Sequence, residues 1–61
     1  MSQQQSVIAA LSKEPLTTIE ILEKAHKVPH ILKLYTILDE LRNKGVINSY
    51  LEEGIKFHCV A

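Results

Sequence analysis

The stretch that decides the fold is "KVPHILKLYTILDELRNKGVI", residues 27–47. Proline near its start suits the first position of a helix, and glycine near its end suits the left-handed residue that closes one. The pattern predicts a helix over residues 29–44, from Pro29 to Lys44 and about 22 Å long, with Gly45 as its cap. The core stripe of this helix, at helical spacing, is expected to be Ile31, Leu34, Leu38 and Leu41.

Two shorter helices are expected before this one. Ser2 with Gln5 fits a capping box, in which two side chains satisfy amide groups at a helix start. Pro15 ends that segment, because it pushes the preceding residue towards an extended form. Thr17 with Glu20 forms a second capping box and predicts the start of the second helix.

Both short helices have an apolar face at helical spacing. The first is expected to bury Val7, Ile8 and Leu11. The second is expected to bury Ile19, Leu22 and Ala25, with Ile21 at the margin. These faces indicate helices that pack on a shared core.

After Gly45 the pattern alternates, which is typical of strands. The runs "VINSYL" and "IKFHCV" are separated by "EEG", which predicts a hairpin with a three-residue loop and a positive φ at Gly54. An extended piece around Leu16 is expected as a third strand, and Cys59 as a small core residue. The sequence therefore predicts one α+β domain over residues 1–61, three helices followed by a hairpin.

Composition limits the class of protein. Hydrophobic residues make up 46% of the chain and charged residues 23%, as in globular proteins. No apolar run is long enough to span a membrane, and the N-terminus lacks the basic start of a signal peptide. One cysteine cannot form an internal disulfide, so we expect a cytoplasmic protein. Seven basic residues balance seven acidic ones, and this lacks the positive excess usual in nucleic-acid-binding proteins.

Metal binding and catalysis are not expected. His26 and His30 have the spacing of half a zinc finger, but the cysteine pair of such a finger is absent. His58 and Cys59 are adjacent on a predicted strand, so they point to opposite faces. Both glycines are explained as turns, which leaves no glycine-rich phosphate loop. We therefore expect no enzyme activity, no cofactor and no metal.

The stretch "LTTIEILEKAHKVPHILKLYTILDELRNKGVINSYLEEGIKFHCVA", residues 16–61, resembles a winged helix-turn-helix domain. Within it, "LYTILDELRNKGVI" resembles the passage from recognition helix to wing in bacterial winged-helix repressors, including those of the ferric-uptake and PadR-like kinds. The resemblance implies a DNA-binding protein, a transcriptional regulator of a bacterium or phage. Its helix 29–44 would lie in the major groove, and a homodimer would bind a palindromic site.

The resemblance also implies which residues would contact double-stranded DNA. The N-terminal half of the third helix would face the bases through His30, Lys33, Tyr35 and Thr36. The flanking DNA backbone would be held by Arg42, Lys44 and Lys56.

A second interpretation is a winged-helix protein–protein interaction module or subunit that does not bind nucleic acid. Asp39 and Glu40 lie where phosphate would approach, and the hairpin tip carries Glu52 and Glu53. Apolar residues also cover much of the circumference of the third helix, which suits a helix that binds a protein partner. The expected partner interface is Leu32, Tyr35 and Ile37.

Overall fold

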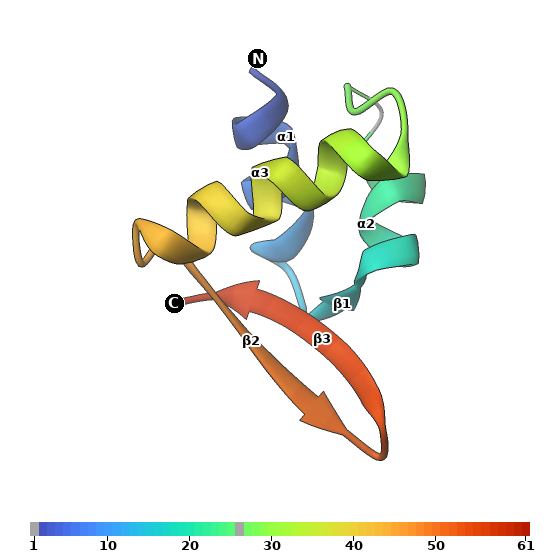
Figure 1. The fold of residues 1–61 in the computed structure, drawn as a ribbon, viewed down its shortest axis with the longest axis vertical. Coiled ribbons are helices and arrows are strands. Elements are labelled where there is room, and N and C mark those ends of the chain that lie inside the picture. Colours follow the sequence, from blue (N-terminus) through green and yellow to red (C-terminus); the bar gives the residue numbers. More distant parts are fainter. Residues whose placement is uncertain (1, 26) are drawn as a thin grey trace.

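A computed structural model describes residues 2–25 and 27–61 and has three helices and a three-stranded antiparallel sheet (Figure 1). The elements in chain order are α1 (Gln3–Leu11), β1 (Leu16–Thr17), α2 (Thr18–Lys24), α3 (Ile31–Asn43), β2 (Ile47–Glu52) and β3 (Ile55–Val60). The predicted α+β arrangement of three helices and a C-terminal hairpin is confirmed, and β1 is the predicted third strand. Within the described ranges, every helix is too short or too polar to cross a membrane.

Both predicted capping boxes start helices. At α1, the Gln5 backbone N–H donates to Ser2 Oγ at 3.1 Å, and the Ser2 N–H donates to Gln5 Oε1 at 3.3 Å. At α2, the Thr17 N–H donates to Glu20 Oε1 at 2.9 Å, and the Glu20 N–H donates to Thr17 Oγ1 at 3.3 Å. Amides that have no partner within the helix are thereby satisfied.

The third helix begins two residues later than predicted. Its first helical residue is Ile31, and His30 is the N-cap in extended backbone, with φ −161°. His30 Nδ1 accepts the Lys33 backbone N–H at 3.3 Å, which is the bond that a capping side chain supplies. Pro29 therefore lies just outside the helix, before the His30 cap.

The end of α3 is closed as predicted. Gly45 has φ +77°, the left-handed conformation that glycine adopts readily. Its N–H donates to Arg42 O at 3.0 Å, and the Val46 N–H donates to Leu41 O at 3.0 Å. These two bonds form a Schellman motif, which stops the helix and turns the chain into β2.

The core lies where the three helices meet the sheet. α3 contacts α1, α2 and β2, so its buried arc is wider than one stripe. Ile37 is only 3% exposed, and its prediction as an interface residue was wrong. On α2 the prediction was wrong for two residues, since Ile21 is fully buried and Ile19 is 56% exposed, whereas Ala25 is buried as predicted. The buried apolar residues are Val7, Leu11, Leu16, Ile21, Ala25, Val28, Leu34, Ile37, Leu38, Leu41 and Ile47.

The hairpin has a tighter turn than predicted. Glu52 pairs with Ile55, so the loop has two residues, Glu53 and Gly54. Both have positive φ, +53° and +80°, as a type I′ turn requires. The prediction of positive φ at Gly54 is confirmed, whereas the three-residue loop was wrong.

The side chain that β3 turns towards the core is not the one predicted from the sequence. The strand order is β1-β3-β2, and Leu16 of β1 pairs with His58 of β3. His58 is 3% exposed and faces the helices, whereas Cys59 is half-buried on the other face. Phe57 stacks on Tyr50 on that outer face, with ring centroids 5.8 Å apart. The prediction of Cys59 as a core residue was therefore wrong, because strand pairing gives the inward position to His58.

Candidate functional site

The side of α3 that faces away from the core is open. Leu32, Thr36, Asp39 and Asn43 follow one another at helical spacing on this side, and all are exposed. In Figure 1 α3 passes in front of α1, and no helix or strand covers it in that view. The hairpin of β2 and β3 projects beyond the helices beside α3. This geometry leaves one helix surface and one hairpin available to a partner.

The residues predicted to contact bases lie on this exposed helix, but they point in different directions. Thr36 lies on the open stripe, whereas Lys33 and Tyr35 lie on opposite flanks of it, since helical residues are spaced by about 100°. Thr36 Oγ1 donates to the Leu32 backbone O at 3.3 Å, and Tyr35 is 50% exposed. At His30 the capping bond occupies Nδ1, so Nε2 is the nitrogen left for a ligand.

The acidic residues of α3 have partners within the chain. Arg42 Nη2 lies 2.6 Å from Asp39 Oδ1, an ion pair of half-exposed groups whose net contribution to stability is about 0–1 kcal/mol. Glu40 Oε2 accepts from Gln4 Nε2 of α1 at 3.1 Å, which draws this carboxylate towards the α1 side. Arg42 thus neutralises the charge of Asp39. The same guanidinium group was predicted to contact the DNA backbone, and in this structure it is paired with a carboxylate of its own helix.

The hairpin supplies Lys56 on the side that faces the helices. Lys56 pairs across the hairpin with Leu51, and both lie beyond the core, with Leu51 71% exposed. Lys56 and Arg42 are both near enough to His58 to lower its pKa. One positive charge from α3 and one from β3 therefore act on the buried imidazole of His58. Lys44 is the exposed C-cap of α3, at the same end of the helix as Arg42 and next to the turn into β2.

His58 is the site residue that sequence reasoning missed. Its Nε2 lies 2.9 Å from Thr18 Oγ1 and its Nδ1 lies 2.7 Å from Ser49 Oγ. Burial lowers the pKa of His58 below its ordinary value, and the positive charges of Lys56 and Arg42 lower it further. The ring is therefore neutral at pH 7 and links α2, β2 and β3. The apolar neighbours Phe57 and Cys59 hid this role in the sequence.

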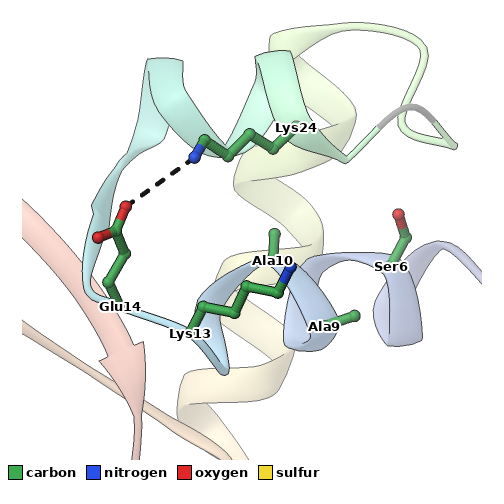
Figure 2. A pocket seen from close by; sticks show the side chains of 6 residues that line it. All are labelled: Ser6, Ala9, Ala10, Lys13, Glu14 and Lys24. Carbon is green, nitrogen blue, oxygen red and sulfur yellow. Dashed lines mark ion pairs between the residues drawn. The ribbon is translucent and has the colours of Figure 1, made fainter.

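A shallow groove of about 540 Å³ lies on the α1 and α2 side of the molecule. In Figure 2 α3 runs behind α1 and α2, so this groove opens away from the exposed side of α3. Its lining combines small residues with charged ones: Ser6, Ala9, Ala10, Lys13, Glu14 and Lys24. Lys24 Nζ lies 3.9 Å from Glu14 Oε1. The groove contains none of the predicted DNA-contact residues, so substitutions in it serve as controls for substitutions on α3.

Within residues 2–25 and 27–61, no group of three His, Cys, Asp or Glu side chains could hold a metal ion. Of the pair His26 and His30, His26 lies outside the described residues.

The predicted partner interface is only partly present. Leu32 is 70% exposed and Tyr35 50%, whereas Ile37 belongs to the core. Elsewhere on the described surface, the further exposed large hydrophobic side chains are Ile19 on α2, Tyr50 and Leu51 on β2, and Ile55 and Val60 on β3. The chain matches no protein-family model, and a comparison with curated proteins finds no similar sequence either.

Proposed function

We propose that the protein is a small winged-helix DNA-binding protein, a transcriptional regulator of a bacterium or phage, with α3 in the major groove. The observation that carries the proposal is the open side of α3 next to a projecting hairpin. The 13 residues of α3 form a cylinder about 20 Å long and about 10–12 Å across. Such a cylinder fits a major groove about 12 Å wide.

The roles of the contact residues follow from their positions. Lys33 and Thr36 in the N-terminal half would approach base edges or phosphate, and the Tyr35 hydroxyl would reach phosphate. His30 would contribute through Nε2, since Nδ1 caps the helix. The flanking phosphates would be held by Arg42, Lys44 and Lys56.

The charge pattern supports a weak interaction with few phosphate contacts. The chain has no net charge, and the Asp39 carboxylate is balanced by Arg42. With about three phosphate contacts, the logarithm of the affinity would fall with the logarithm of salt concentration with a slope of about −3. In this role the protein would work in the cytoplasm, where Cys59 stays reduced.

Fluorescence anisotropy with a labelled duplex tests the proposal. Binding is expected at about 50 mM salt, where phosphate contacts are strong. Lys33→Ala should weaken it, whereas Lys13→Ala, which removes a lysine from the groove on the far side, should not. Absence of binding at this salt concentration contradicts the proposal. Equal effects of the two variants contradict the assignment of α3 as the contact surface.

A second candidate, a module that binds protein and not nucleic acid, is favoured by the exposed leucines. Leu32 on α3 and Leu51 on the hairpin are 70% and 71% exposed, and large exposed apolar side chains are common at protein interfaces. An amide-shift titration separates the two candidates. Shifts at Leu32 and Tyr35 that depend on protein concentration and disappear in Leu32→Glu, with no response to duplex DNA, support the second candidate.

A further inference from the structure

The strand β2 lies at the edge of the sheet. In the strand order β1-β3-β2 it pairs with β3 along its six residues, Ile47 to Glu52. Its other edge faces no strand in the described parts of the chain (Figure 1). A strand edge of this kind presents a row of backbone groups that can pair with another strand.

The backbone groups on the open edge can be identified. The Ala61 N–H donates to Val46 O at 3.0 Å, and hydrogen bonds in an antiparallel pair recur at every second residue. Residues 46, 48, 50 and 52 therefore turn their N–H and C=O groups towards β3. Ile47, Ser49 and Leu51 turn theirs to the open edge, which gives three donors and three acceptors for a second strand.

This edge lacks the features that prevent pairing. β2 contains no proline and no lysine, and its one-to-one register with β3 has no bulge. Its only charged residue is Glu52, at the end. Leu51 is 71% exposed beside this edge, so a neighbouring strand would remove apolar surface from water.

The charges at the two ends of the strand are complementary. The chain enters β2 after Lys44 and leaves it through Glu52 and Glu53. In an antiparallel pair of two β2 strands, the basic start of each faces the acidic end of the other. Symmetry forms this contact twice, and opposite charges across a strand pair are favourable.

We propose that β2 pairs with β2 of a second copy of this chain, antiparallel, about a two-fold axis at Ser49. Ser49 then lies opposite Ser49 of the second copy, and Ile47 lies opposite Leu51. This register uses all six free backbone groups and brings the end of β2 that follows Lys44 to the end of the other β2 that precedes Glu53. Opposite residues point to one face, so the six-stranded sheet carries both α3 helices on the same side. The inference does not rest on DNA binding.

Charge reversal tests the proposal in the intact chain. Sedimentation equilibrium should show a species with twice the mass of one chain, which dissociates on dilution. Lys44→Glu and Glu53→Lys should each weaken the dimer about tenfold or more, because each turns two attractions into repulsions. An equal mixture of the two variants should restore it, since both contacts then join opposite charges. Restoration also proves that the variants fold.

A second variant tests the strand edge itself. Leu51→Pro removes an N–H from the open edge and leaves the bonds to β3 intact, a position where proline is tolerated. It should abolish the dimer, whereas Leu51→Thr, which keeps the N–H, should weaken it less. If the chain is a monomer at every concentration, the proposal is overturned, and the open edge of β2 would then be available only to a strand of another protein. A dimer that ignores both charge reversals overturns it as well.

Discussion

His58 joins three elements through two short hydrogen-bond contacts. Its ring lies between the hydroxyls of Thr18, at the start of α2, and Ser49, in β2. A neutral imidazole donates from one nitrogen and accepts at the other, and each hydroxyl can rotate to match. An unsatisfied buried polar group costs about 1–3 kcal/mol, so both hydroxyls matter to the placement of this ring.

The burial of His58 predicts that stability depends on pH. Because its pKa in the folded chain lies below 6.5, the unfolded chain binds a proton more readily. The free energy of unfolding should therefore be highest above pH 6.5 and fall as the pH drops towards the folded pKa. Urea denaturation from about pH 7.5 to about pH 5 measures this slope. His58→Gln should flatten it, and an unchanged slope in that variant contradicts the assignment.

The negative charge of Asp39 on the open side of α3 should lower the affinity for DNA. Asp39→Asn removes an acidic group from the open side of α3 and releases Arg42, which is now 2.6 Å away in an ion pair. Duplex affinity at about 50 mM salt should rise about threefold as a result. Glu14→Gln is the matched control, since it removes an acid from the groove on the other side. A loss of affinity in Asp39→Asn argues against α3 as the DNA-binding element.

At the scale of elements, α3 has one side buried in the core and one side exposed to solvent. Leu38 is 2% exposed within the core, and Leu32 is 70% exposed on the open side. Leu38→Ala should lower the free energy of unfolding by about 2–5 kcal/mol, because it leaves a cavity. Leu32→Ala should change it by less than about 0.5 kcal/mol. Chemical denaturation compares them, and equal losses contradict the described orientation of α3.

The hairpin turn contains a residue that is poorly suited to its backbone. Glu53 has φ +53°, a conformation that asparagine adopts more readily than glutamate. Glu53→Asn creates the Asn-Gly pair that type I′ turns prefer, so it should stabilise the chain by about 0.5–1 kcal/mol. Glu52→Asn, in the strand next to it, should give no such gain. Thermal unfolding of both variants measures the difference, and a lower Tm for Glu53→Asn contradicts the turn geometry.

The elements could be predicted from the sequence because their ends carry local signals. The capping boxes, Gly45 and Gly54 set the backbone conformation of residues close to them in the sequence. The two boxes start helices and both glycines have positive φ, as predicted. The side that each element buries depends on distant partners. Packing of α3 on three elements buried Ile37, and pairing with β1 and β2 turned His58 inward. No local pattern contains that information.

At the scale of the molecule, 61 residues support a modest margin of stability, about 3–9 kcal/mol by the usual value per residue. The chain uses this small core to hold α3 with one side open and the hairpin beside it. Because the charges balance, the proposed binding to DNA would depend on a few placed cations. The candidate DNA surface and the groove at α1 and α2 lie on different sides.

Amide-shift mapping by NMR with duplex DNA tests the central claim most directly. At about 50 mM salt, the largest shifts should fall on the N-terminal half of α3, around Lys33 and Thr36, and on the hairpin near Lys56. The groove residues Ala9 and Lys13 should not respond, and added salt should reverse the shifts. An absence of shifts at this salt concentration, or shifts confined to the groove, contradicts DNA binding through α3.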